Sequence, residues 1–106
     1  IDKAYHSKQS DVQVLGVGKV IKVLKDDTKG SQHQRFLVKL PSNLTILIAH
    51  NIDLAPRVAD LKAGDAIEFY GEYEWNNKGG VVHWTHHDPR KKHKDGWLKH
   101  NGVIYQ

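Results

Sequence analysis

The sequence contains no cysteine, and this absence excludes several kinds of chemistry at once. Without thiols the chain has no disulfide framework, no thiolate zinc site and no cysteine nucleophile, so its stability must come from packing. It also lacks any apolar run near the roughly 20 residues that a membrane-spanning helix requires. A length of 106 residues provides one hydrophobic core and no second domain. We therefore expect one domain over residues 1–106 and no membrane span.

The common catalytic motifs are missing as well. No nucleophile elbow is present, and Gly16 and Gly18 lack the third glycine and the following helix of a phosphate-binding loop. The sequence therefore identifies no reaction by motif.

Most of the chain has the pattern of short strands separated by turns. Apolar and polar residues alternate over 33–40 and 65–75, which predicts strands with one buried face. Residues 12–24 form a longer predicted strand, in which two glycines predict the bend or bulge that lets a sheet close. The apolar run 44–50 predicts a third strand that is covered, or nearly covered, on both faces. Residues 81–87 predict a fifth strand, which pairs with the fourth through a tight turn.

Two segments have the pattern of short helices. Residues 1–10 predict an N-terminal arm or a marginal helix, which is too short to be stable unless it docks. In the second segment, Asp53 can cap a helix whose apolar residues recur at helical spacing, at Leu54, Val58 and Leu61. We therefore expect a short helix between the third and fourth strands.

The order of these elements is strand, strand, strand, helix, strand, strand, which is the order of an OB fold. Asn101-Gly102 adds a strong indication of a C-terminal β-hairpin. The sequence thus predicts an all-β protein with one short helix. Its parts are a five-stranded OB-like closed barrel over residues 12–87, then a basic loop and a C-terminal hairpin over 88–106. A small SH3-like barrel is the alternative, and the inserted helix counts against it.

Positive charge is concentrated at the C-terminal end. Residues 1–75 carry ten Lys or Arg and ten Asp or Glu, so the whole net charge of +4 lies in residues 76–106. Five of the eight histidines lie in the same stretch, and an unperturbed histidine titrates near pH 6.5. This distribution favours an anionic partner, with a solvated basic face as the alternative.

An OB-like barrel binds its ligands on the outer face of strands two and three and in the loops at 25–32 and 76–80. The ligand-binding candidates are the basic and aromatic residues of these regions and of the basic C-terminal loop: Arg35, Lys39, Trp75, Lys78, Arg90, Lys91 and Lys92. The ligand we expect is an extended anionic or polar chain, either a nucleic acid or an oligosaccharide. The acidic row Glu68, Glu72 and Glu74 and the shortage of outward aromatics count against generic single-strand binding.

The histidines also raise the hypothesis of a metal site, because imidazole and carboxylate suit several divalent metals. On a regular strand His83 and His87 would lie about 13 Å apart, too far to share an ion. His86 and Asp88 share a face and could do so with a third ligand, which gives the candidates His50, His86, Asp88 and His93. Alternatively, the Asp88 carboxylate accepts hydrogen bonds from nearby backbone amides. No other cofactor is expected.

Longer runs also stand out: His33-Gln34-Arg35-Phe36, Gly71-Glu72-Tyr73-Glu74-Trp75-Asn76, His83-Trp84-Thr85-His86-His87-Asp88-Pro89 and Gly96-Trp97. Together they resemble a bacterial family of domains of unknown function, numbered 3465, over nearly the whole chain from Val12 to Gln106. Members of this family look like small proteins with an N-terminal export signal. A sequence that opens on Ile1 instead of methionine fits the loss of such a signal. We therefore expect a periplasmic or secreted protein, with a cytoplasmic location left open. The family implies no activity.

The sequence favours a non-enzymatic binding module for an extended anionic or polar ligand. Two rivals stay open. One is a histidine-based metal-binding protein or metal-dependent hydrolase such as a nuclease, and the other is a nucleic-acid-binding OB domain led by the basic C-terminal segment. The arrangement of the histidines in space is the observation that separates them.

Overall fold

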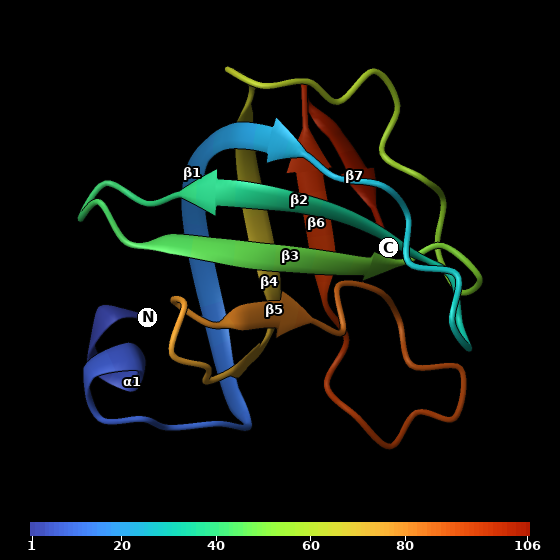
Figure 1. Ribbon diagram of the computed structural model, residues 1–106. Coiled ribbons are helices and arrows are strands. Elements are labelled where there is room, and N and C mark those ends of the chain that lie inside the picture. The colour runs from blue at the N-terminus through green and yellow to red at the C-terminus, as the bar shows by residue number, and fades with distance from the viewer.

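Seven strands and one short helix make up the regular structure of the chain (Figure 1). The computed structural model describes residues 1–106. The helix is α1 (Asp2–His6), and the strands are β1 (Val12–Val23), β2 (His33–Lys39), β3 (Thr45–Asn51), β4 (Ala66–Glu74), β5 (Val81–His83), β6 (Trp97–His100) and β7 (Val103–Tyr105). The protein is therefore mostly β, as its alternating pattern predicts. None of its helical structure has the length and apolar character needed to cross a membrane.

The first five strands form a closed barrel. Hydrogen-bonded neighbours follow the order β1-β2-β3-β5-β4, and β4 pairs with β1 to complete the ring. Every pairing in the ring is antiparallel except that of β3 with β5. The hairpin of β6 and β7 extends the sheet beyond the barrel, because β6 pairs with the part of β4 that β5 does not reach.

β1 can pair with two neighbours because it bends. Its residues 12–19 pair with β4 and its residues 19–23 pair with β2, with a register shift between Val20 and Lys22. Gly16 and Gly18 face the barrel interior, where a Cβ atom on Gly16 would lie 2.5 Å from the ring of Phe69. The register shift therefore follows the two glycines instead of lying at them, since both pair regularly with β4. Glycine is needed there because the strands approach closely where the barrel closes.

Alternate residues of the strands fill the barrel interior. In β2 and β4 the residues predicted to share the inner face are buried, among them Phe36 and Phe69. In β3, Ile46, Ile48 and His50 are buried and the residues between them are half-buried. The outer face of β3 is therefore covered only in part, and none of its residues is fully exposed. Its outer face borders the groove described below.

The predicted helix between β3 and β4 is not formed, and residues 52–65 adopt turns and irregular structure. The backbone groups of Val58 and the side chain of Asp53, which a helix would need for its own hydrogen bonds and cap, instead bond to residues far away in the sequence. The Gln34 side chain donates to the Val58 carbonyl and accepts from the Val58 amide, at 3.1 and 2.9 Å. The Asp53 carboxylate accepts from the amide of Gln32 instead of capping a helix. The helical spacing is misleading here, because Val58 is buried whereas Leu54 is exposed.

The predicted fifth strand is shorter than expected. β5 ends at His83, and Trp84 adopts a positive φ of 55° that is incompatible with a continuing strand. Residues 84–96 form a loop that leads to β6, and the amide of Gly96 donates to the carbonyl of His86 across it. The regular strand geometry assumed for His86 and Asp88 therefore does not apply.

Candidate binding groove and histidine–carboxylate cluster

A groove crosses the outer face of the barrel where β2, β3 and β5 lie next to one another. It consists of three adjoining hollows of about 350, 250 and 510 Å³. The first and second hollows share His33 and His83, and the second and third share Leu54 and Trp84. The three hollows are therefore neighbours in a row that leads from β2 to the 84–96 loop.

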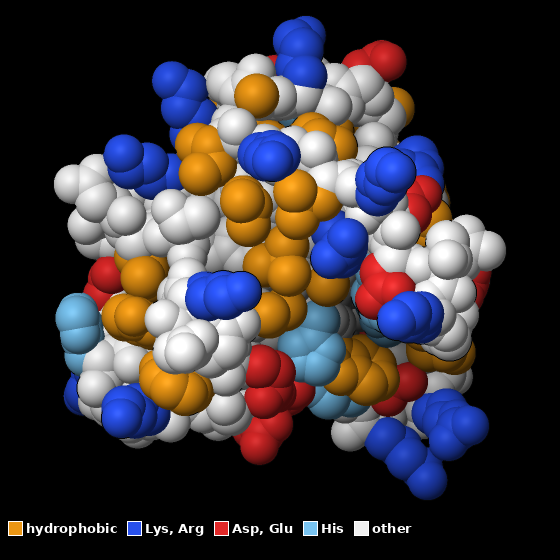
Figure 2. All heavy atoms as spheres, in the orientation of Figure 1, with side chains coloured by type: hydrophobic (Ala, Val, Ile, Leu, Met, Phe, Trp, Pro, Cys, Tyr) orange, Lys and Arg blue, Asp and Glu red, His pale blue; other side chains and the backbone are white.

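Both ends of the groove carry basic side chains. Arg35 lines the β2 end, where its Nε donates to the carbonyl of Lys25 at 3.1 Å. Arg90 and Lys92 line the far end. Figure 2 shows this face of the molecule, with Lys and Arg side chains around an apolar area and with acidic and histidine side chains gathered near β5. The groove thus has basic ends and a histidine-rich middle.

The Asp88 carboxylate binds three backbone amides of the loop that carries Arg90 and Lys92. Asp88 accepts hydrogen bonds from the backbone amides of Arg90, His93 and Lys92, at 3.0, 2.7 and 2.9 Å. These three bonds hold the pKa of the Asp88 carboxyl below its usual value. Both carboxylate oxygens are therefore used within the loop, which is the turn-forming role that the sequence offers as an alternative to metal binding.

An aromatic pair lies in the middle of the groove. The indole of Trp84 stacks on the imidazole of His93, with ring centres 4.0 Å apart and planes inclined by 9°. Trp84 is half-buried and lines both the second and the third hollow. A positive φ is rare for a bulky residue and persists where the surroundings enforce it. The loop therefore holds a flat aromatic surface at the centre of the groove.

Beside the first hollow lies a histidine–carboxylate cluster made of Glu72, Glu74, His83 and His93. Glu72 lies opposite His83 in the antiparallel pair of β4 and β5, and Glu74 follows two residues later on the same face. The Nε2 atom of His83 lies 3.3 Å from one Glu72 oxygen and 3.4 Å from a Glu74 oxygen. The other Glu72 oxygen accepts from Nε2 of His93 at 2.8 Å. A strand pair and the 84–96 loop therefore build the cluster together.

The cluster carries an excess of negative charge. A hydrogen bond to Glu74 and repulsion between the two carboxyls raise the pKa of Asp11, which lies next to the cluster. His93 donates to Glu72 and also, from Nδ1, to the carbonyl of Lys94, so both of its ring nitrogens carry protons. Burial is the largest single influence and would lower the pKa of His93, but the hydrogen bonds to Glu72 and to the Lys94 carbonyl, together with the charges of Glu72 and Asp88, outweigh it and the pKa is raised. The acceptors at both ring nitrogens therefore favour the protonated form of His93.

The four residues predicted as metal ligands do not form a common site. His50 is buried, its Nδ1 accepts from the Thr85 hydroxyl at 2.7 Å, and its Nε2 donates to the Pro56 carbonyl at 2.8 Å. This burial lowers the pKa of His50 to about 4. His86 donates from Nδ1 to the carbonyl of the next residue. The three side chains that do have metal-ligand spacing are Glu72, Glu74 and His83.

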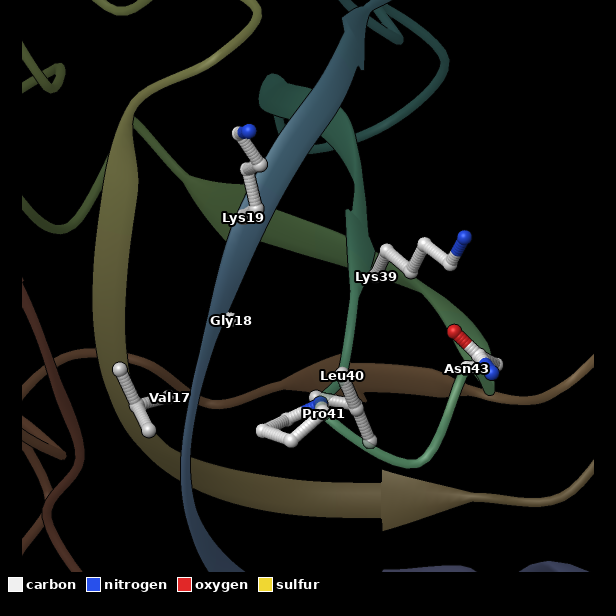
Figure 3. A pocket seen from close by; sticks show the side chains of 7 residues that line it. All are labelled: Val17, Gly18, Lys19, Lys39, Leu40, Pro41 and Asn43. Carbon is white, nitrogen blue, oxygen red and sulfur yellow. The ribbon is translucent and has the colours of Figure 1, made fainter.

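Four of the predicted ligand-binding residues lie outside the groove. Trp75 donates from Nε1 to the carbonyl of Tyr5 at 3.0 Å, and so fastens α1 to the barrel. Lys39 lines a separate hollow of about 370 Å³ between β1 and the turn after β2 (Figure 3). Lys78 and Lys91 are exposed and line none of the three hollows. The other three predicted residues line the groove, with Arg35 at one end and Arg90 and Lys92 at the other.

A pattern followed along one strand at a time does not reveal the cluster. Glu72 and Glu74 look like an acidic row on one strand, and His83 lies too far from His87 on the next. The two strands are joined by a short turn at 76–80, so counting outward from that turn places His83 opposite Glu72. Cross-strand register is therefore the signal that identifies the cluster.

The fold and the site together define a class of protein: a small closed β-barrel with an elongated groove on its outer face. The chain belongs to the family described as Protein of unknown function (DUF3465), whose model matches residues 1–106. The family membership indicated by the sequence is thereby confirmed. No curated protein and no solved structure matches the chain.

Proposed function

We propose that this protein is a non-enzymatic binding module with an OB-like fold, and that it binds an extended anionic or polar ligand in the groove. The observation that carries the proposal is the row of three neighbouring hollows from Arg35 to Lys92. A ligand that followed them would cross the outer faces of β2, β3 and β5 and reach the 84–96 loop.

The strand order supports the OB-like part of the proposal. The ring runs β1-β2-β3-β5-β4, and its closing pair joins β4 to β1. OB barrels bind oligonucleotides and oligosaccharides on the face of strands two and three and in the loops that follow strands one and four. The groove occupies the same face, and Asp27 from the loop after β1 lines its first hollow.

The lining of the groove favours an acidic oligosaccharide over a nucleic acid. Basic groups at the two ends suit a ligand whose negative charges are spaced along its length. Between them Leu54 and Trp84 offer an apolar, flat surface on which a sugar ring can pack. Asp27 and Glu74 also line the β2 end. Their carboxylates repel closely spaced phosphates but accept hydrogen bonds from sugar hydroxyls.

Fluorescence anisotropy with two labelled probes tests this function. One probe is a uronic acid oligosaccharide and the other is an oligothymidylate of the same net charge, each titrated at several salt concentrations. We expect saturable binding of the oligosaccharide that weakens as salt rises, and weaker binding of the oligonucleotide. No binding of either probe at low salt would refute the proposal, and a preference for the oligonucleotide would favour a nucleic-acid-binding module.

A pair of matched double variants locates the binding surface. Arg90→Gln with Lys92→Gln removes two positive charges from the groove, whereas Lys39→Gln with Lys78→Gln removes two from outside it. The first double variant should weaken oligosaccharide binding by about tenfold or more, because each lost contact to an anionic group costs about 1 kcal/mol. The second should leave the affinity within about twofold. Equal weakening by both would show that only the net charge attracts the ligand.

A further inference from the structure

We propose that Glu72, Glu74 and His83 form a binding site for a divalent transition metal ion, with Zn²⁺ the best fit, at the wall of the first hollow. This site is separate from the proposed function of the groove, because it needs no groove ligand. It also differs from the set of His50, His86, Asp88 and His93 that the sequence suggests.

The spacing of the ligand atoms fits a tetrahedral ion. Zn²⁺ takes nitrogen and oxygen ligands at about 2.0–2.1 Å, so two ligand atoms at tetrahedral corners are roughly 3.3–3.4 Å apart. The Nε2 atom of His83 lies 3.3 Å from Glu72 and 3.4 Å from Glu74. These separations are longer than a good N–H···O hydrogen bond, whose length is about 2.7–3.2 Å. All three ligand atoms lie within 4.8 Å of one another.

The backbone beneath the three side chains is fixed. Glu72 and Glu74 lie on the outer face of β4, and His83 lies on β5 directly across from Glu72. The buried Tyr73 between the two glutamates points into the core and pairs with Val82. The three side chains therefore start from a rigid hairpin, and little conformational entropy is lost when they close on an ion.

Neighbouring groups support the ligands. His93 donates to one oxygen of Glu72 and leaves the other oxygen toward His83, as hydrogen-bonded carboxylate ligands of metals commonly require. Trp84 stacks on His93 and holds its ring in place. Glu72 is thus supported by His93 and, through it, by Trp84.

The site also has an open side. The side chains of Glu74 and His83 are 34% and 32% exposed, and both line the first hollow of the groove. Three protein ligands plus one open position are typical of zinc sites that keep a water molecule. The structure thus favours an ion that exchanges its fourth ligand with the groove over a sealed structural ion.

Zn²⁺ titration of untagged, chelator-stripped protein against a chromogenic chelator at pH 7.5 tests the site. We expect one Zn²⁺ per chain. Glu72→Gln, Glu74→Gln and His83→Asn should each weaken binding by more than tenfold, and His93→Gln by about tenfold, as for lost outer-shell partners of metals. The matched control is His87→Asn, because His87 also contacts a carboxylate, that of Asp95 at 2.9 Å, but outside the cluster. This control should bind Zn²⁺ as the parent protein does.

Two results would overturn the proposal: no saturable Zn²⁺ uptake by the parent protein, or a loss of uptake in the His87 variant equal to that in the His83 variant. Thermal melts in the presence of chelator show whether a variant is still folded. The Glu74→Gln variant should melt like the parent protein, so its loss of Zn²⁺ binding cannot be due to misfolding. Nuclear magnetic resonance gives a second readout, in which Zn²⁺ should shift the ring nitrogens of His83 and leave those of His87 unchanged. The double variant Arg90→Gln, Lys92→Gln should keep its Zn²⁺ affinity, so this test and the groove test fail independently.

Discussion

Two histidines, His50 in the barrel interior and His83 in the groove, differ in how completely they are paired. Inside, His50 has a partner on each ring nitrogen, and Gln34 makes two hydrogen bonds to Val58. In the groove, His83 faces two carboxylates at 3.3 and 3.4 Å, without a short bond to either. The comparison separates groups that hold the fold from groups that are free to bind something else.

The hydrogen bonds of His50 and Gln34 have a structural task that the contacts of His83 lack. His50 joins β3 to the 52–65 segment through Pro56 and to the 84–96 loop through Thr85. Gln34 joins β2 to the 52–65 segment. Both segments contribute to the groove, through Leu54 and Trp84. The hydrogen bonds of His50 and Gln34 therefore hold the two segments that line the groove against the barrel.

Removal of His50 should have the largest effect on stability. His50→Ala leaves a cavity and strips the Pro56 carbonyl and the Thr85 hydroxyl of their partner, at a cost of about 3 kcal/mol in the free energy of unfolding. Urea denaturation measures it, with His87→Ala as the exposed control, expected within about 0.5 kcal/mol of the parent protein. Equal costs for the two variants would remove the distinction between interior and surface histidines.

The stability of the protein should fall as the pH is lowered from about 6.5 to about 4. Burial lowers the pKa of His50 to about 4 in the folded chain, against 6.5 when exposed. The unfolded chain therefore binds one more proton in this window, which lowers the free energy of unfolding by up to about 3 kcal/mol. Urea melts across this range measure the slope. His50→Gln should flatten it, and an unchanged slope in that variant would contradict the assignment.

Gln34→Ala should cost somewhat less, about 2 kcal/mol, because it removes two hydrogen bonds and leaves the buried Val58 amide and carbonyl without partners. The control is Gln32→Ala, since Gln32 is exposed and contributes its backbone amide rather than its side chain. Urea denaturation compares the two variants. A difference below about 0.5 kcal/mol would show that water replaces the side chain of Gln34.

The smallest effect should come from the groove. Glu74→Gln relieves the repulsion that raises the pKa of Asp11, so we expect the variant to melt at the same temperature as the parent protein or slightly above it. Differential scanning calorimetry in chelator measures the change. A loss greater than about 1 kcal/mol would place Glu74 among the groups that hold the fold.

The sequence predicts the fold best where a single local pattern decides the structure. Alternation identifies β2 and β4, and Asn101-Gly102 identifies the pairing of β6 with β7. The prediction of a helix within 52–65 is wrong for a physical reason. The side chain of Gln34, 24 residues away, hydrogen-bonds to the backbone of Val58, and no local sequence pattern shows this. The early end of β5 depends on the backbone angle of Trp84, which packing decides.

The candidate site could be predicted in part. Arg35, Arg90 and Lys92 follow from charge and from the expected binding face, and all three line the groove. The turn-forming role of Asp88 is one that the sequence offers, and the structure shows it. The role of His50 could not be predicted, because it depends on which backbone and side-chain groups come near in the folded chain. The hydrogen-bond partners of a histidine in the folded chain, rather than its place in the sequence, decide whether it binds a metal or links two segments of the fold.

The most direct test of the groove is to map ligand contacts on the whole chain by nuclear magnetic resonance. An acidic oligosaccharide added to ¹⁵N-labelled protein at physiological salt should shift the amide signals of residues along the groove, from Arg35 through His83 and Trp84 to Lys92. The signals around Lys39 and Lys78 should stay in place. Shifts spread over all exposed lysines, or confined to the hollow beside Lys39, would contradict the account.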